Sequence, residues 1–127
     1  MIEVVAGIIY KGDKFLIAQR NLKKSQGGYW EFPGGKVELN EDEKSAIERE
    51  IYEEFELKVK AIKFIHNNIC EYPTRTIDLR LYECKYVSGE FKLHDHYEYM
   101  YVDKLELLDY DLCPADIPLA RYVKEMK

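Results

Sequence analysis

The chain has 127 residues, of which 46% are hydrophobic and 34% are charged, and its net charge at pH 7 is −5. This length suits one domain, residues 1–127, and leaves no room for a second domain of ordinary size. The hydrophobic content excludes a disordered chain, and no segment approaches the roughly 18 consecutive apolar residues of a membrane-spanning helix.

The first predicted elements form a β-hairpin. Residues 2–10 are rich in β-branched side chains, residues 11–14 predict a turn, and residues 15–20 return as a second strand. An acidic third residue and the lack of a small-residue cleavage site indicate a strand rather than a signal peptide. The three cysteines are dispersed and predict reduced thiols of a cytoplasmic protein rather than disulfides or a zinc site: Cys70, Cys84 and Cys113.

A long helix is predicted after a polar loop at residues 21–29. The tripeptide Pro33-Gly34-Gly35 predicts a backbone bend that glycine adopts at low cost. Asn40 is the expected N-cap, with Glu43 three residues later, and the helix is expected to end near Phe55. Apolar residues at helical spacing predict its buried stripe: Ala46, Ile47, Ile51 and Phe55.

The rest of the chain is predicted to form strands and a terminal helix. In order, these are strands at 59–71, 76–87 and 95–102, a short turn at 104–108 capped by Asp103, and a helix at 116–127. Asp116 is the expected N-cap of this helix, with Leu119, Tyr122 and Val123 facing inward. Strands interrupted by two helices predict an α/β fold with a mixed β-sheet between helices.

The acidic residues are concentrated in one stretch. Residues 36–57 hold nine acids and three bases and carry −6, whereas the remaining 15 acids and 16 bases sum to +1. Such a surface repels a polyanion unless a metal ion intervenes. The sequence therefore disfavours binding of extended nucleic acid, which requires a basic surface.

Three glutamates in this stretch crowd one edge of the predicted helix. Glu50, Glu53 and Glu54 lie three and four residues apart, with Arg49 beside them. Like charges at this spacing destabilise an isolated helix, which indicates a use for them. Carboxylates are ligands for divalent cations, and Mg²⁺ is usually shared with substrate phosphates. The alternative is a solvated acidic helix face held by i,i+4 pairs.

The spacing of these residues resembles the signature box of the Nudix hydrolases. That box reads Gly, five residues, Glu, seven residues, then Arg-Glu-aliphatic-any-Glu-Glu-any-Gly-aliphatic. The positions that match are Gly35, Glu41, Arg49, Glu50, Ile51, Glu53, Glu54 and Leu57. Glu56 replaces the Gly that ends the helix, where a left-handed residue is favoured. We expect this replacement to cost about 1 kcal/mol of stability rather than to abolish activity.

The resemblance implies an α/β/α sandwich and a Mg²⁺-dependent hydrolase, with Mn²⁺ as a substitute ion. It implies metal ligation by the carbonyl oxygen of Gly34 and by the carboxylates of Glu50, Glu53 and Glu54. Arg49 would orient these glutamates. Glu41 would brace them or act as an outer ligand.

A further acid, Asp95, lies where relatives often have a glutamate before a histidine. It is a candidate extra metal ligand or general base, whereas the adjacent His96 is expected to be structural. The group that deprotonates the attacking water stays open among Glu50, Glu41 and Asp95.

Motifs outside the box resemble the MutT-type branch, which includes 8-oxo-dGTP and CTP pyrophosphohydrolases. They are the segments 17–20, 30–38, 71–75 and 113–118. The branch implies that Arg20, supported by Arg75, steadies the phosphates or sugar of a nucleotide. Phe32 and Tyr72 are expected to line the base pocket.

Asp116 has two interpretations, which are compatible: a helix N-cap and a reader of the base edge. An ionised carboxylate only accepts hydrogen bonds. It suits guanine N1–H and N2–H₂, or the lone amine of cytosine. A protonated Asp116 could pair with both N4–H₂ and N3 of cytosine.

The implied reaction is hydrolysis of a modified or surplus nucleoside triphosphate, such as 8-oxo-dGTP or a CTP-type nucleotide, to a monophosphate and pyrophosphate. One alternative is another Nudix specificity, for a dinucleoside polyphosphate, a nucleotide sugar or an mRNA cap. The other is a non-catalytic domain that senses a nucleotide, which the intact glutamate set disfavours. A monomer or homodimer without membrane contact is expected.

Overall fold

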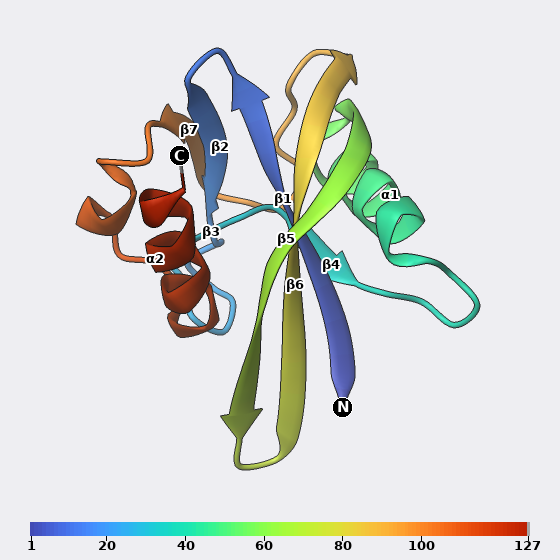
Figure 1. The fold of residues 1–127 in the computed structure, drawn as a ribbon, viewed down its shortest axis with the longest axis vertical. Coiled ribbons are helices and arrows are strands. Elements are labelled where there is room, and N and C mark those ends of the chain that lie inside the picture. The colour runs from blue at the N-terminus through green and yellow to red at the C-terminus, as the bar shows by residue number, and fades with distance from the viewer. Residues whose placement is uncertain (127) are drawn as a thin grey trace.

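The computed structural model describes residues 1–126, which form a mixed seven-stranded sheet and two α-helices (Figure 1). The strands are β1 (Ile2–Lys11), β2 (Lys14–Gln19), β3 (Trp30–Glu31), β4 (Gly34–Lys36), β5 (Lys58–Tyr72), β6 (Arg75–Ser88) and β7 (Glu98–Val102). The helices are α1 (Glu43–Phe55), α2 (Ile117–Glu125) and the short 3₁₀ turns η1 (Leu107–Asp109) and η2 (Pro114–Asp116). None of these helices is both long and apolar enough to cross a bilayer.

Strand β1 lies at the centre of the sheet and pairs along both edges. One edge runs parallel to β6, from Ile2 opposite Ile77 to Ile9 opposite Cys84. The other edge is divided between β4, which pairs with residues 4–6, and β2, which pairs with residues 10–11. Strand β5 pairs antiparallel with β6, and β2 pairs with β3 and β7. The single strand β1 therefore holds the two parts of the sheet together.

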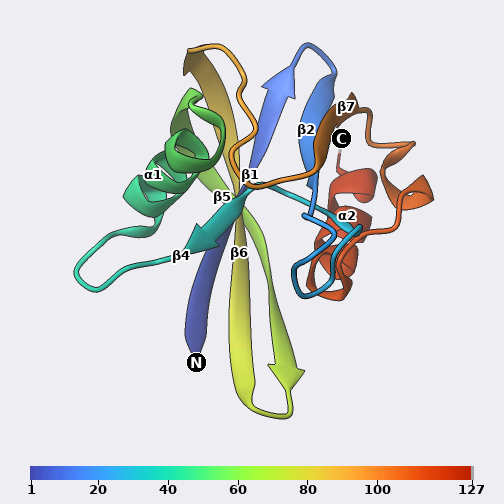
Figure 2. The ribbon, with the colours of Figure 1, turned by 180° about the vertical axis from the view of Figure 1, so that it is seen from behind.

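The two α-helices lie on opposite sides of the sheet, as both views show (Figures 1 and 2). Side chains of a strand alternate between its faces. Accordingly, Val5 and Ile9 pack toward the core cluster that contains α1, whereas Ala6 and Ile8 belong to the cluster that contains α2. The predicted fold class, a mixed sheet between helices, is confirmed.

Helix α1 begins two residues later than the sequence predicted. Asp42 is the N-cap, and its carboxylate accepts a hydrogen bond of 2.8 Å from the backbone N–H of Ser45. Asn40, the predicted cap, instead has a left-handed backbone (φ 65°) in the preceding loop. The predicted buried stripe, 46, 47, 51 and 55, is confirmed. At the other end Glu56 adopts φ 56°, so the helix does end in a left-handed residue although that residue is not glycine.

The bend predicted for the Pro33-Gly34-Gly35 segment lies at Pro33 and does not use a glycine conformation. Gly34 and Gly35 are part of the extended strand β4, and neither has a positive φ. A Cβ atom on Gly34 would lie 1.9 Å from the backbone oxygen of Val5. Glycine is required here because β4 passes so close to β1.

The C-terminal helix differs from the prediction in its cap and in one face. Leu119 and Val123 are buried as predicted, but Tyr122 is 43% exposed and stacks on the ring of His66. Asp116 is the N-cap residue of α2, as predicted, but its side chain makes no capping hydrogen bond and is buried. One earlier strand is displaced, because β7 begins at Glu98 rather than at 95. The turn predicted at 104–108 is confirmed: residues 104–106 form a turn that continues into η1, and Oδ1 of Asp103 accepts hydrogen bonds of 2.9 Å from the backbone N–H groups of Leu105 and Glu106.

Candidate active site

A cavity of about 670 Å³ opens between β4, α1, the tip of the β5–β6 hairpin and the segment that leads into α2. This volume lies in the range of small-molecule sites. It brings together eight of the predicted site residues: Arg20, Phe32, Gly34, Glu54, Tyr72, Arg75, Asp95 and Asp116. The other four lie beside it on or near α1 rather than in its wall: Glu41, Arg49, Glu50 and Glu53.

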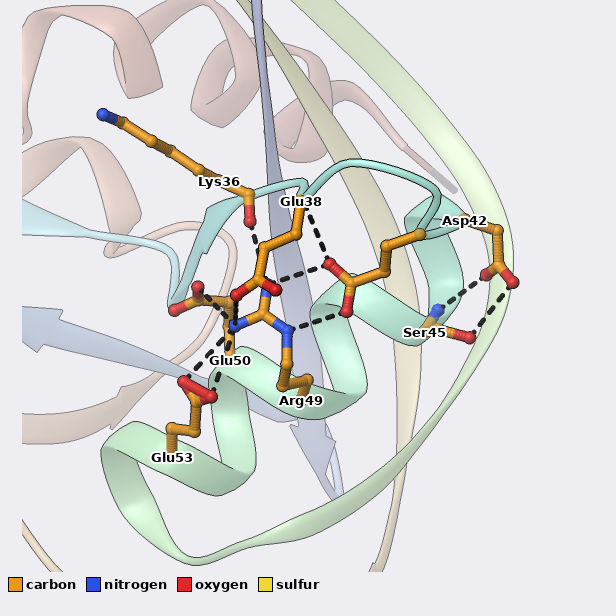
Figure 3. A network of polar contacts seen from close by, with 8 residues as sticks. Lys36, Glu38, Asp42, Ser45, Arg49, Glu50 and Glu53 are labelled. Carbon is orange, nitrogen blue, oxygen red and sulfur yellow. Dashed lines mark hydrogen bonds and ion pairs between the residues drawn. The ribbon is translucent and has the colours of Figure 1, made fainter.

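Arg49 lies at the centre of an acidic network on α1 (Figure 3). Its guanidinium donates to both carboxylate oxygens of Glu41, at 2.7 and 2.9 Å. It also contacts Glu50 at 2.9 Å and Glu53 at 3.3 Å. The hydrogen bonds from Arg49 lower the pKa of Glu41 to about 2. With Glu38 at 3.4 Å, Arg49 thus contacts four carboxylates, a pattern compatible with the orienting role that the resemblance implied for it.

The network is more than a helix face with i,i+4 pairs. Only the contact between Arg49 and Glu53 has that spacing, whereas Glu41 and the backbone oxygen of Lys36 belong to the preceding loop and strand. Within residues 1–126, however, no three His, Cys, Asp or Glu side chains converge closely enough to hold an ion. In this structure Glu50 and Glu53 face Arg49. Both glutamate side chains would have to rotate to bind a metal ion.

Glu50 lies against the backbone of the glycine pair. A Cβ atom on Gly35 would lie 2.3 Å from the carboxyl carbon of Glu50. Glycine at this position therefore gives the carboxylate room to approach β4, whose Gly34 lines the cavity. Burial raises the pKa of Glu50, although Arg49 opposes the effect.

Of the three glutamates predicted as metal ligands, Glu54 is the one that lines the cavity. Its Oε2 is buried and has no hydrogen-bond partner. Loss of hydration raises its pKa to about 7; the charge of His96 opposes this, and the charges of Glu31, Glu50 and Asp95 add to it. A buried anion among other carboxylates gains from a nearby cation. The donor set at this end of the cavity thus fits a hard divalent ion.

His96 and Glu31 connect this end of the cavity to the other end. The sequence predicted only a structural role for His96 and did not single out Glu31. The Nε2 of His96 lies 2.8 Å from Oε2 of Glu31, and its Nδ1 lies 3.2 Å from Oε2 of Glu54. Glu31 also accepts a hydrogen bond of 3.1 Å from Arg20. The sequence signal for Glu31 was its place between two large aromatic residues, Trp30 and Phe32, since an acid in apolar surroundings needs partners.

Asp116 and Phe32 form the opposite, less charged end. Asp116 is 5% exposed, and its Oδ2 accepts a hydrogen bond of 2.9 Å from the backbone N–H of Phe32. Burial raises the pKa of Asp116 well above its usual value. Cys113 lies next to this pair, and burial raises the pKa of its thiol to about 12, so the thiol is neutral.

The rim of the cavity carries the remaining predicted residues. Tyr72 and Arg75 lie at the tip of the β5–β6 hairpin, on either side of its turn. Asp95, in the loop before β7, is 44% exposed and forms an ion pair with Lys24, which also lines the cavity. Arg20, Lys24 and Arg75 therefore provide positive charge around an otherwise acidic cavity.

Comparisons with known proteins agree with this arrangement. A family model described as "NUDIX domain" matches residues 4–122. The chain is 39% identical over 119 residues to the CTP pyrophosphohydrolase of Escherichia coli (strain K12), covering 94% of this chain and 88% of that protein. It is 39% identical over 116 residues to putative 8-oxo-dGTP diphosphatase 2 of Mycobacterium tuberculosis (strain CDC 1551 / Oshkosh), covering 89% and 81%. The solution structure of the E. coli ORF135 protein is similar, with a TM-score of 0.85 and 37% identity, covering 96% of this chain and 87% of that one.

Proposed function

Because the chain belongs to the NUDIX domain family, we propose that it is a nucleoside triphosphate pyrophosphohydrolase of the MutT type. It would convert a nucleoside triphosphate and water to a nucleoside monophosphate and pyrophosphate. The observation that carries this proposal is the cavity, which has the carboxylate of Glu54 at one end and a less charged end at Phe32 and Asp116. A nucleotide has the matching polarity, with phosphates at one end and a base at the other.

Enzymes of this family generally need a divalent metal, and we assign Mg²⁺ here, with Mn²⁺ as a substitute. Glu50, Glu53, Glu54 and the carbonyl oxygen of Gly34 would hold it. The ion, when bound, neutralises phosphate charge and lowers the pKa of water. The unpartnered buried Oε2 of Glu54 supports this assignment, because a buried polar atom without a partner is rare in folded proteins.

The chain's own residues then bind and orient the substrate. Arg20 and Arg75 would contact the phosphates or sugar from the rim of the cavity. Glu41 is a poor candidate for the general base, because Arg49 holds its pKa at about 2 and an efficient base titrates near the working pH. Glu50 and Asp95 remain as candidates, and the pH profiles of Glu50→Gln and Asp95→Asn would separate them.

Recognition of the base would rest on Asp116. Its raised pKa favours a neutral carboxyl group, which both donates and accepts hydrogen bonds. Such a group can donate to N3 and accept from N4–H₂ of cytosine, whereas guanine presents two adjacent donors. We therefore propose CTP-type nucleotides as the preferred substrates and 8-oxo-dGTP as the second candidate, which the name of the mycobacterial relative supports.

A substrate panel tests the proposal directly. Release of pyrophosphate would be measured for CTP, dCTP, 5-substituted cytidine triphosphates, dGTP and 8-oxo-dGTP, with Mg²⁺ and with a chelator. We expect cytidine nucleotides to give the highest kcat/KM, and activity to disappear with the chelator. Nucleotide binding without turnover would instead indicate a sensor, and turnover confined to dinucleoside polyphosphates or nucleotide sugars would indicate a different Nudix specificity.

Variants of the acidic network test the metal site. Glu53→Gln and Glu54→Gln should each lower kcat by at least about 100-fold in a folded protein. Near-normal turnover of either variant would refute the assigned ligands.

A further inference from the structure

We propose that His96 is a positioning residue that links the substrate-binding end of the cavity to the metal-binding end. Each ring nitrogen would hold one carboxylate, so that Nε2 orients Glu31 at the substrate-binding end and Nδ1 orients Glu54 at the metal-binding end. This inference rests on the proposed function for its consequences, but its geometry stands independently of any substrate.

The position of the ring supports this role. The side chain of His96 is 6% exposed, and both of its nitrogens face carboxylate oxygens, at 2.8 Å for Glu31 and 3.2 Å for Glu54. The ring also packs against Phe55, with 5.1 Å between the ring centroids. An imidazole that only fills space would not need a carboxylate at each nitrogen.

The contact to Glu54 is incompletely formed in this structure. Within residues 1–126, the buried side-chain nitrogen and oxygen atoms that lack a hydrogen-bond partner are Nδ1 of His96 and Oε2 of Glu54, and these two atoms face each other. A small rotation of the Glu54 carboxylate would therefore change the distance and angle between its Oε2 and Nδ1 of His96. We infer that the imidazole limits this rotation and so selects the orientation in which the carboxylate faces the cavity.

The other contact extends the link toward the substrate. Glu31 receives hydrogen bonds from Nε2 of His96 and from Arg20, whose side chain lines the cavity. Displacement of the imidazole would release one side of Glu31 and change the direction of the Arg20 guanidinium. His96 therefore acts on the substrate through Glu31 and on the metal through Glu54, without touching either.

Two substitutions separate the two contacts. The side-chain nitrogen of Asn lies near the position of Nδ1, and that of Gln lies near the position of Nε2. His96→Gln should keep the contact to Glu31 and lose that to Glu54, which should weaken metal binding about 10- to 100-fold. His96→Asn should have the opposite effect: metal affinity close to that of the parent, and weaker binding of nucleotide.

Both effects would be measured without turnover. Titration calorimetry of the substrate-free protein with Mn²⁺ gives the metal affinity, and titration with an α,β-methylene nucleoside triphosphate at saturating Mn²⁺ gives the nucleotide affinity. Because the first titration contains no nucleotide, a parent protein that hydrolyses no triphosphate would refute the proposed function alone. Opposite selectivity of the two variants would support the link.

Matched controls exclude a general effect of histidine replacement. His94→Gln replaces a 49% exposed histidine two residues away, which pairs with Glu56 outside the cavity, and should leave both affinities unchanged. Glu31→Gln keeps His96 and its contact to Glu54, so it should weaken nucleotide binding and leave Mn²⁺ affinity close to that of the parent, as His96→Asn does; this arm does not depend on a His96 variant that folds. Equal losses of both affinities in His96→Gln and His96→Asn, or a loss of metal affinity in Glu31→Gln, would overturn the proposal.

Discussion

Replacement of Glu54 by Gln should make the metal-free protein more stable at alkaline pH while it abolishes catalysis. Burial raises the pKa of Glu54 from 4.5 to about 7. The side chain is 23% exposed, so solvent screening reduces the effect only in part. Above pH 7 the folded protein therefore carries an anion that its surroundings disfavour, and Gln removes that charge with little change in shape.

The magnitude follows from the two pKa values. At about 1.4 kcal/mol for each pH unit, the difference between 4.5 and about 7 corresponds to a penalty of about 3 kcal/mol. Partial exposure and the weaker contact of Gln with His96 reduce the expected gain to about 2 kcal/mol. For a domain of this length that gain raises Tm by about 6 to 10 °C.

The stability difference between Glu54→Gln and the parent should depend on pH. Because the folded-state pKa is the higher one, the folded protein binds more protons than the unfolded chain between pH 4.5 and about 7. The parent therefore loses stability as pH rises through this interval and loses no more above it. The advantage of Glu54→Gln should be absent below pH 4.5, grow up to pH 7 and then stay constant.

Urea denaturation of chelator-treated protein between pH 4 and pH 9 measures this advantage. Glu53→Gln is the matched control, because the Glu53 side chain is 56% exposed and its replacement should change stability little. Two results would contradict the conclusion that burial destabilises the ionised carboxylate of Glu54. One is a Glu54→Gln variant that is no more stable than the parent at pH 8, and the other is a stability advantage that does not vary with pH.

Three further predictions concern residues that shape the site. Gly34→Ala should lose at least about 3 kcal/mol in urea denaturation, because a Cβ 1.9 Å from the oxygen of Val5 forces backbone movement; parental stability would contradict this. Glu56→Gly should gain about 1 kcal/mol, since Glu56 has φ 56°; a lower Tm would refute that reasoning. Glu41→Gln should remove the stability that the parent holds above pH 4.5 and loses as pH falls toward 2; identical acid unfolding of variant and parent would rule it out.

The sequence predicted best the features that depend on local periodicity. The buried stripe of α1 and the two longest strands follow from side-chain spacing, and the structure bears out both. A helix fixes which of its own residues share a face, so the buried stripe is readable from one chain. Arg49 and Glu41 also meet, with two hydrogen bonds, but Glu41 lies in the loop before α1, and the resemblance rather than helix periodicity implied its role.

Features that depend on contacts between distant segments were not predictable in this way. Asp116 has the residue type and position of an N-cap, but its carboxylate instead binds the backbone of Phe32, 84 residues earlier. The partners of His96 lie on β3 and α1, and nothing near His96 in the sequence indicates them. The requirement for glycine at position 34 also comes from tertiary structure, because only the close approach of β1 excludes a side chain there.

The parallel pairing of β1 with β6 has a consequence for biosynthesis. Ile9 pairs with Cys84, 75 positions later in the chain. At about 5 to 20 residues per second a ribosome needs roughly 4 to 15 seconds to make that interval, and contacts between such distant segments form slowly in any case. Until then the edge of β1 opposite β4 has no partner strand, so the sheet that supports β4 is incomplete. The nascent chain therefore acquires its catalytic geometry last, after most of the polypeptide has been translated.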